Sequence, residues 1–403
     1  MKSRFSYTLL TIILLTLGFS GGYVFGQSPL APIALFASKT EMPAGADEAF
    51  APFWEVWELV HTRFYEQPVD DAELTEGAID GMLAVLDDPH TRYLSPQDEA
   101  ATRERMDGEF QGIGATVESV DGAITVVSPV DGSPAEMAGL QPGDILREAD
   151  GIELTGMDLL DAVIIVRGPA GTAVSLLIER NGELLNVEIV RDIIELISAR
   201  GEMLDEGIAY VRITQFGYRT TTELDEALTA VMAENPTGLI LDLRRNPGGG
   251  LDTVVEIADQ FLPAGIVLEE EFGDGRINTF ESTEKGLAEE IPMVVLIDEG
   301  SASASEVLAG AIRDRERGIL IGQTSFGKGT VQTWHGLSNG GGVRITIARW
   351  LTPDATWVHE NGIEPDYLIA IPEGDNPDDF VDTQLQAAID YLLGNPILQN
   401  NEE

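Results

Sequence analysis

Three serines, Ser301, Ser303 and Ser305, lie where an apolar segment ends and an amphipathic one begins. Residues 293–298 predict a buried strand, and residues 305–314 predict a helix that starts in the small-residue turn between them. Such a turn exposes a side chain at the carboxyl end of a strand and directs helix N–H groups toward it, which favours a negatively charged oxygen. One serine here is therefore a candidate nucleophile, although Ser305 could cap the helix and Ser301 could fill the turn.

A lysine between glycines, Lys328, follows and leads into a predicted strand. A lysine amine acts as a general base only when it is neutral, and with an ordinary pKa of ~10.4 about one in a thousand is neutral near pH 7.4. Burial lowers a lysine pKa and carboxylates raise it, so we expect apolar, carboxylate-free surroundings formed by Phe326, Val331 and the glycines. In an alternating strand, Lys328 and Gln332 would project from the same face.

A third segment combines a predicted buried strand at 239–243 with a turn that contains three consecutive glycines, 248–250. A glycine-rich turn between a strand and a helix can hold a phosphate, but this one lacks the Gly-Lys-Ser/Thr sequence of a P-loop. From the residues alone it is a structural turn without an assigned ligand.

These segments belong to a region of alternating strands and helices. Strands are predicted at 208–214, 239–243, 293–298, 319–322, 330–335 and 343–350, and helices at 221–233, 251–260 and 305–314. This alternation predicts an α/β core at residues 196–372.

Before this core, residues 108–195 predict a small β-rich domain. Short strands are expected at 115–120, 124–128, 145–149, 173–180 and 184–191, and helical pieces near 134–139 and 156–167. A glycine-containing loop directly before the first strand can turn successive N–H groups toward a carboxylate, while the strand offers an edge to an extended peptide. The loop consists of Gly112, Ile113, Gly114 and Ala115.

The amino-terminal residues 1–27 predict an export signal, because basic residues precede an uncharged apolar run. A run of roughly 19 residues is long enough to span a bilayer, which favours an uncleaved signal anchor with the remaining chain outside the cytoplasmic membrane. Cleavage, which would give a secreted form, is the alternative. Residues 28–48 are expected to be a linker, and residues 49–107 a helical region.

Composition excludes several kinds of protein. The 403 residues include 24 Lys and Arg against 69 Asp and Glu, a formal net charge of −45, which opposes nucleic-acid binding and equally fits a saline habitat or solubility. The chain has no Cys, and its four His have no ligand spacing, so we expect no metal and no other cofactor. Residues 373–403 form an acidic C-terminal segment without a predicted element.

Residues 133–146, with the sequence SPAEMAGLQPGDIL, and the loop at 112–115 closely resemble PDZ domains, and the likeness covers residues 108–192. This resemblance implies that the loop captures the C-terminal carboxylate of a protein or peptide. Arg167 matches an Arg through which the PDZ domain is thought to communicate with an active site.

Several motifs in the same order resemble the carboxy-terminal processing proteases, also called tail-specific proteases. They lie at 87–94, 242–249, 300–306, 326–332, 348–353 and 362–366. The resemblance implies a Ser-Lys serine endopeptidase with a crotonase-like ββα core, an α/β (α+β) fold. Such an enzyme would recognise accessible C-terminal tails through its PDZ domain and cleave exported or membrane-associated proteins near their C-termini.

The resemblance also implies roles for single residues. Ser303 matches the nucleophile, Lys328 the general base and Gln332 the residue that orients this base. The backbone N–H groups of Ala304 and of a glycine, Gly249 in preference to Gly248, match the oxyanion donors.

Two other functions stay open at this point. A non-catalytic receptor for C-terminal peptides could share this fold, because a fold alone does not establish an activity. A Ser-His hydrolase would use His359 as its base. Self-association and the natural substrate are also left open.

Overall fold

The computed structural model describes residues 44–120, 122–284, 286–371 and 381–397. The predicted export signal and most of the predicted linker lie outside these residues. The chain divides into two compact units, residues 1–75 and 76–403, each described here by itself. Within the described ranges, no helix combines the length and apolar character that crossing a membrane requires.

The expected amino-terminal helices are present. They are α3 (Ala46–Arg63), α4 (Asp71–Ala84) and α5 (Pro96–Asp107). Helix α5 begins at a capping serine, because Ser95 Oγ accepts a hydrogen bond from Asp98 N at 3.1 Å and Pro96 stands in the first turn. Helix α3 has no buried residue, and Phe50, Trp54, Val56 and Leu59 are exposed.

The predicted small β-rich domain forms around one sheet. Its strands have the order β3 (Ala115–Val120), β4 (Ala123–Pro129), β5 (Ile145–Ala149), β7 (Ala173–Arg180) and β8 (Glu183–Val190), and β6 (Ile152–Glu153) pairs with β5. Helices α6 (Pro134–Met137) and α7 (Leu159–Val166) accompany the sheet, and β2 (Glu109–Gly112) pairs with β9 (Asp192–Glu195) where the chain enters and leaves. Strand β3 pairs only with β4 in the described part of the chain, so its other edge is free.

The predicted α/β core contains a six-stranded sheet. Its strands have the order β10 (Ala199–Met203), β11 (Ile208–Ile213), β12 (Gly238–Asp242), β15 (Met293–Ile297), β16 (Ile319–Gly322) and β19 (Tyr367–Leu368). All neighbouring pairs are parallel except β10 with β11. Strands β12 and β15 are buried at every position, as expected for parallel strands covered on both faces.

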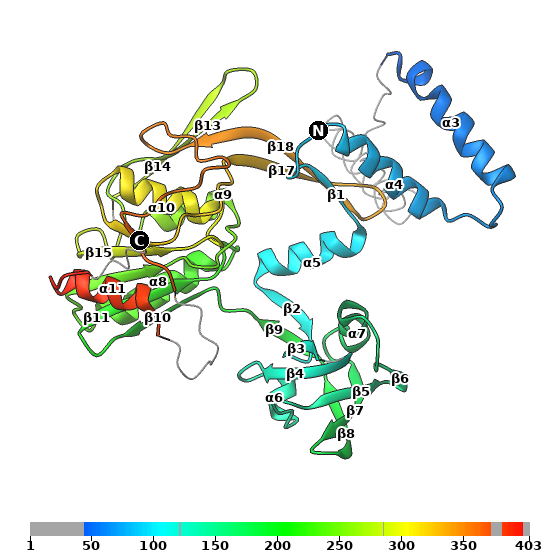
Figure 1. Ribbon diagram of the computed structural model, residues 1–403, viewed down its shortest axis with the longest axis horizontal. Coiled ribbons are helices and arrows are strands. Elements are labelled where there is room, and N and C mark those ends of the chain that lie inside the picture. Colours follow the sequence, from blue (N-terminus) through cyan, green and yellow to red (C-terminus); the bar gives the residue numbers. More distant parts are fainter. Residues whose placement is uncertain (1–43, 121, 285, 372–380, 398–403) are drawn as a thin grey trace, which may run out of the picture. The chain divides into compact units, whose positions relative to one another are not determined.

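Helices cover the two faces of this sheet, which lies below α10 and beside α11 in Figure 1. One face packs against α8 (Thr220–Met232), α9 (Leu251–Ala258) and α10 (Ala304–Asp314). The other face packs against α11 (Thr383–Leu392), whose buried side chains include Ala387, Ala388 and Ile389. Successive strand residues such as Leu239 and Ile240 therefore enter different apolar clusters.

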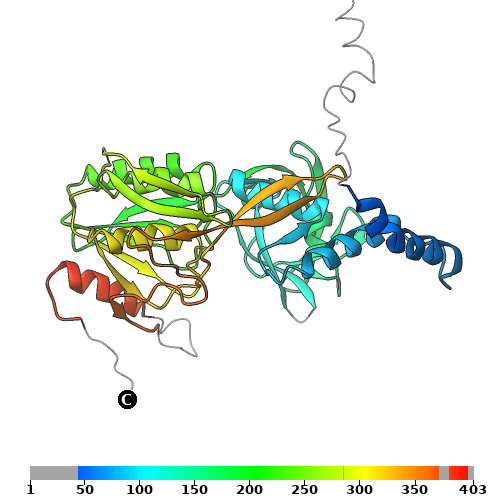
Figure 2. The same ribbon diagram turned by 90° about the horizontal axis from the view of Figure 1, so that it is seen from above.

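A second sheet lies beside this core. It joins β1 (Arg92–Leu94), β18 (Gly342–Leu351), β13 (Gly265–Phe272) and β14 (Ile277–Ser282), with β17 (Thr330–Gly336) paired to β18. Figure 2 shows β17 and β18 extending together from the core as a long antiparallel pair, in agreement with the predicted strands.

Several elements were not expected from the sequence. The hairpin β13–β14 and the strands β1, β2, β6, β9, β10 and β19 were not predicted, because they are short or carry runs of charged residues such as Glu269–Glu271. The C-terminal segment holds helix α11, which its polar surroundings concealed.

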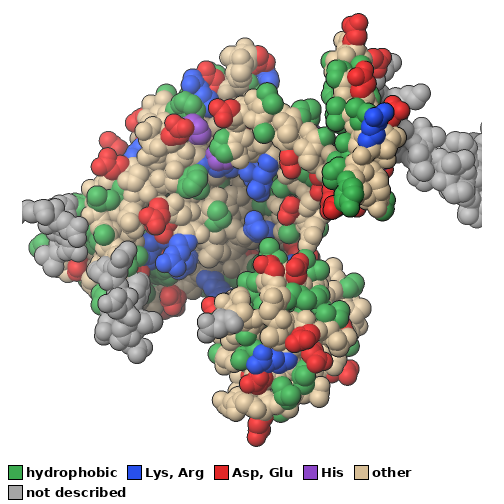
Figure 3. Space-filling view, turned by 45° about the vertical axis from the view of Figure 1, so that its right-hand side comes forward, with side chains coloured by type: hydrophobic (Ala, Val, Ile, Leu, Met, Phe, Trp, Pro, Cys, Tyr) green, Lys and Arg blue, Asp and Glu red, His purple; other side chains and the backbone are tan. Residues whose placement is uncertain are grey.

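On the face shown in Figure 3, acidic side chains are scattered rather than gathered in one patch, so they mark no single docking surface there.

Candidate active site

The three segments singled out in the sequence meet at one edge of the six-stranded sheet. Strands β12, β15 and β16 are parallel neighbours, so the turns after their carboxyl ends lie side by side. Hydrogen bonds connect these turns: Ala302 N donates to Asn246 O at 3.0 Å, and Phe326 N donates to Ser301 O at 3.0 Å. The strand order thus brings together residues that are far apart in the chain.

Among the three serines, only Ser303 is partly accessible. Ser301 and Ser305 are fully buried, and their hydroxyls donate to Leu243 O at 2.9 Å and to Asn246 O at 2.8 Å. Ser303 is the N-cap of α10, so the expectation that Ser305 caps this helix is wrong. Its backbone has φ 56° and ψ −114°, a rare conformation for a residue with a side chain and one that concentrates at functional sites.

A buried carboxylate, that of Glu306, joins the serine turn to the lysine turn. Its Oε2 accepts hydrogen bonds from Ser303 N at 2.7 Å and Lys328 N at 2.9 Å. Its Oε1 accepts from Ser325 Oγ at 2.7 Å and Gly327 N at 2.6 Å. Because one carboxylate binds both turns, it fixes their spacing.

Sequence reasoning did not assign this role to Glu306. The signal was its position three residues after Ser303, where an acidic side chain can bind the N-cap amide. Its hydrogen bonds to the turn at 325–328 depend on the pairing of β15 with β16, which the local sequence does not specify.

The environment of Lys328 favours the neutral amine. Burial is the main cause that lowers the pKa of Lys328 to about 8, and the positive charge of Arg344 lowers this pKa further, against the opposing effect of Glu306. With a pKa of 8, about one amine in five is neutral at pH 7.4. No ion pair of the Lys328 amine is present within the described ranges.

The expected composition of these surroundings was wrong. Glu306 lies directly against the Lys328 backbone, so the pocket is not free of carboxylates. Four hydrogen bonds to this carboxylate stabilise its charge, and Arg344 offsets its effect on the lysine pKa. Phe326 is 59% exposed and does not provide the expected apolar cover.

Gln332 contacts threonines rather than Lys328. Its Nε2 donates to Thr330 Oγ1 at 2.9 Å and Thr346 Oγ1 at 3.2 Å, while Oε1 accepts no hydrogen bond from the described part of the chain. The predicted shared face does not follow from strand alternation, because β17 starts only at Thr330 and its register shifts between Val331 and Gln332.

The glycine-rich loop packs closely against the serine turn. A methyl group added to Gly248 would lie 2.8 Å from Ser303 Cβ and 2.9 Å from Ala304 N, so only glycine permits this close approach. The N–H of Gly248 donates to Asn246 Oδ1 at 2.9 Å. The N–H groups of Gly249 and Ala304 donate no hydrogen bond within the described ranges, so both remain available to a ligand.

Two histidines lie near Lys328 without the arrangement of a histidine base. The rings of His90 and His359 are 6.3 Å apart, and His359 stacks on Trp357 at 5.0 Å. His359 Nδ1 is buried without a hydrogen-bond partner in the described chain, whereas a catalytic histidine is normally oriented through its second nitrogen. Burial and the charge of Lys328 lower the pKa of His90.

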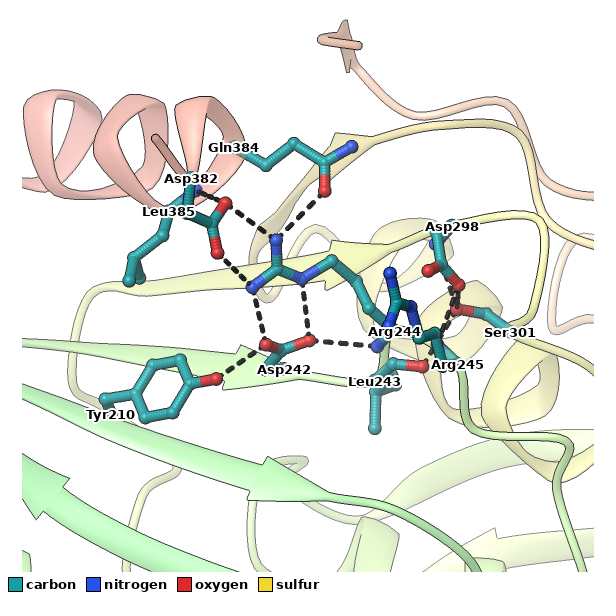
Figure 4. Close-up of polar contacts among 10 residues, drawn as sticks. All are labelled: Tyr210, Asp242, Leu243, Arg244, Arg245, Asp298, Ser301, Asp382, Gln384 and Leu385. Carbon is teal, nitrogen blue, oxygen red and sulfur yellow. Dashed lines mark hydrogen bonds and ion pairs between the residues drawn. The ribbon is translucent and has the colours of Figure 1, made fainter. Parts of the chain in front are cut away.

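Beneath the glycine-rich loop and the serine turn lie two polar networks, shown in Figure 4. In one, Asp298 Oδ1 accepts hydrogen bonds from Arg245 N at 2.7 Å and Gly300 N at 3.0 Å. In the other, Arg244 binds Asp242 and Asp382. Sequence reasoning identified neither network, because Asp382 lies in a segment for which no element was predicted.

The predicted peptide-binding loop lines an apolar groove in the small β domain. Its walls come mainly from β3, α7 and the loop, with single residues from β2, β4 and β5: Phe110, Ile113, Gly114, Ala115, Val117, Ile124, Leu146, Ala162, Val163, Val166 and Arg167. The N–H groups of Ile113 and Gly114 donate no hydrogen bond in the described chain. Gly112 lies at the end of β2, and Gly114 has φ 75° with Ser133 packed against it.

Arg167 stands at the rim of this groove. Its Nη1 donates to Glu104 Oε2 of α5 at 2.8 Å, and its guanidinium lies 4.6 Å from the centre of the Phe110 ring. Arg167 therefore links the groove to the helix that precedes the small β domain.

Comparisons with known proteins agree with this architecture. The model of peptidase family S41 matches residues 207–369, that of the PDZ domain matches 125–180, and that of the activating protease CtpB N-terminal domain matches 22–98. The crystal structure of a protein from Bacteroides fragilis, described as an S41 protease, has the same fold, with a TM-score of 0.54 and 18% identity. The match covers 85% of this chain and 97% of that one.

Relatives with higher sequence identity identify the family. Over 329 residues the chain is 37% identical to the carboxy-terminal processing protease CtpA of Bacillus subtilis, and the match covers 81% of this chain and 70% of that protein. It is 40% identical over 329 residues to the carboxy-terminal-processing protease of Bartonella bacilliformis, covering 80% of this chain and 75% of that protein. The chain therefore belongs to the carboxy-terminal processing proteases of peptidase family S41 and is a serine-type peptidase with a PDZ domain.

Proposed function

We propose that this protein is a Ser-Lys endopeptidase that captures the C-terminal tail of a protein substrate in its PDZ domain and cleaves the chain near that end. Ser303 is the nucleophile and Lys328 the general base. The observation that carries this proposal is the bond of one buried carboxylate, Glu306, to the backbones of both residues.

The proposed groups would act in sequence. The neutral Lys328 amine accepts the hydroxyl proton as Ser303 Oγ attacks the peptide carbonyl carbon. The N–H groups of Ala304 and Gly249 hold the oxyanion, and the departing amine takes the proton from Lys328. Water then hydrolyses the acyl-enzyme. Gln332 orients the lysine through its free Oε1, which the threonine contacts of its Nε2 leave available.

The groove of the PDZ domain supports tail capture. The N–H groups of Ile113 and Gly114, which have no partner in the part of the chain that the structure describes, suit a terminal carboxylate, and the apolar walls suit an apolar final side chain. The free edge of β3 accepts the preceding residues as an added strand. Because Arg167 contacts both Phe110 in the groove and Glu104 in α5, tail binding would alter this contact first.

The cellular setting and the assembly are part of the proposal. The basic and apolar residues at 1–27 support export, with a membrane anchor facing the periplasm or exterior or, after cleavage, a secreted form. Substrates would then be exported or membrane-associated proteins. The uncovered apolar face of α3 supports self-association.

Two variants test the dyad. Ser303→Ala and Lys328→Met should each abolish cleavage of a peptide with an apolar C-terminus, while fluorescence anisotropy shows unchanged binding of this peptide by the PDZ domain. Activity of the unaltered enzyme should rise with pH through about 8, where Lys328 loses its proton. Turnover by Ser303→Ala, or a flat profile between about pH 5 and 9, would refute the dyad.

A receptor without activity receives less support, because both the serine and the lysine are present. A Ser-His enzyme is disfavoured because His359 Nδ1 lacks an orienting partner within the described ranges. Under that alternative, His359→Gln would abolish activity and Lys328→Met would not.

A further inference from the structure

We propose that the ion pair between Arg244 and Asp382 makes the C-terminal helix α11 a positioning element of the active site. It holds the glycine-rich loop, and through this loop the serine turn, in the geometry that catalysis requires. The inference rests on the proposed function for the reaction that this geometry serves.

The guanidinium of Arg244 is fully engaged between two carboxylates (Figure 4). Toward Asp242 its Nε donates at 3.0 Å and its Nη2 at 2.7 Å. Toward Asp382 its Nη1 and Nη2 each donate at 2.8 Å, and Nη1 also donates to Gln384 Oε1 at 3.1 Å. Paired hydrogen bonds of this kind fix orientation as well as distance.

The charges of Arg244 and Asp242 are buried and the Asp382 side chain is 24% exposed, so water cannot fully replace the partners of Arg244. The Arg244 side chain is 8% exposed and that of Asp242 is fully buried. Burial opposes ionisation of Asp382, but hydrogen bonds from Arg244 outweigh this effect and lower the Asp382 pKa. Burial likewise opposes the charge of Arg244, and the two carboxylates raise its pKa. Removing one partner would leave a buried charge only partly compensated.

A continuous set of contacts leads from this ion pair to the reacting groups. Two residues after Arg244, Asn246 is fully buried, and its Oδ1 accepts a hydrogen bond from Gly248 N at 2.9 Å. Asn246 O accepts from Ala302 N at 3.0 Å and Ser305 Oγ at 2.8 Å. The loop that carries one oxyanion donor therefore also supports the turn that carries Ser303 and Ala304.

Helix α11 is positioned to act as this support. Arg244 and Asp382 are 138 residues apart in the chain, so the pair forms only when α11 lies on its face of the sheet. Asp382 also caps α11 by accepting a hydrogen bond from Leu385 N at 2.9 Å. One carboxylate thus begins the helix and anchors the loop.

The test compares Asp382→Asn with Asp382→Glu and with Asp390→Asn. Asparagine keeps a helix cap but removes the charge that Arg244 binds. Asp390 lies on the same helix, and its side chain contacts Asn395 rather than Arg244, so Asp390→Asn is the matched control. Purified full-length variants are assayed on a peptide substrate well below their unfolding temperatures.

Asp382→Asn should lower kcat by about tenfold or more with KM changed less than about twofold, because the displaced groups act on the transition state. The midpoint of its pH profile should not move, since the surroundings of Lys328 are intact. Asp382→Glu should recover most of the activity, and Asp390→Asn should retain it.

Hydrogen–deuterium exchange gives a readout that does not depend on peptidase activity. Amides of residues 243–251 should exchange faster in Asp382→Asn than in Asp390→Asn. Faster exchange would support the inference that α11 holds the glycine-rich loop, even if the Ser303→Ala test refuted the dyad. The proposal is overturned if Asp382→Asn keeps its kcat, or if exchange in 243–251 matches that of the control.

Discussion

The active site and the peptide groove of this chain differ in how far their polar groups are already bonded. At the active site, the groups that hold the serine and lysine turns together are buried and bonded, and Glu306 alone accepts four hydrogen bonds. The groove has apolar walls, and neither the outer edge of β3 nor the N–H groups of its loop find a partner among the described residues. Catalysis needs fixed distances between reacting groups, whereas tail capture needs surface that a ligand can complete.

This contrast teaches where substitutions should act. A change at the serine–lysine junction should alter the chemical step and leave tail binding intact. A change in the groove should alter binding and leave the chemistry intact. The following three experiments test whether catalysis and tail binding can be altered independently.

The largest effect is expected at Glu306. Glu306→Ala leaves the amides of Ser303, Gly327 and Lys328 without their acceptor, so the two turns lose their fixed spacing, and kcat should fall by about a hundredfold or more. Glu306→Gln keeps the shape and one acceptor oxygen and should lose less. Steady-state kinetics measure kcat, and fluorescence anisotropy of a tail peptide measures tail binding. Weakened tail binding in a folded Glu306→Ala protein would contradict the separation.

A smaller effect is expected in the groove. Val163 lines it, whereas the next residue on α7, Ile164, does not and is 50% exposed. Val163→Asp places a carboxylate among apolar walls beside the bound peptide and should weaken tail binding by about tenfold. Ile164→Asp is the matched control and should bind normally. If both variants bound equally, the groove would not be the peptide site.

The smallest effect concerns Arg344, whose charge lowers the Lys328 pKa. A base is active in its neutral form, so removing this charge raises the lysine pKa and moves the rising limb of activity to higher pH. For Arg344→Gln we expect the rising limb of activity to move up by about half a pH unit, which is about a threefold loss of activity near pH 7.5. The activity at high pH should be preserved.

Arg276→Gln is the control for that experiment. Arg276 pairs with Asp274 at the end of the β13–β14 hairpin and does not contribute to the lysine pKa. An unmoved profile in Arg344→Gln, measured as kcat/KM against pH, would show that the charge of Arg344 does not lower the lysine pKa.

Much of the architecture could be predicted from local patterns. Alternating apolar strands and helices gave the α/β core, and the loop before β3 with the following turns gave the PDZ domain. The small-residue turn and the glycine-flanked lysine marked Ser303 and Lys328. The choice of Ser303 over its neighbours came from the family resemblance, and the buried hydroxyls of Ser301 and Ser305 supply the physical reason.

The missed features share one cause. Glu306, Asp298 and Arg244 act through partners in other turns or at the start of α11, which local patterns do not reveal, and the capping position of Glu306 indicates only its bond to Ser303 N. Helix α11 was hidden because its apolar side is short and lies within an acidic tail. The error about the lysine surroundings arose for the same reason, since the net effect of Glu306 depends on Arg344 from β18.

Periodicity in the sequence predicts the kinds of element, and glycine positions mark the turns that carry the serine and the lysine. The order of the motifs carries the family resemblance. Only the tertiary structure decided which groups meet. Parallel pairing of β12, β15 and β16 placed three distant turns at one sheet edge, and burial there set both the lysine pKa and the hydrogen bonds of Glu306. Distances between remote segments depend on strand order and packing, which no local stretch of residues specifies.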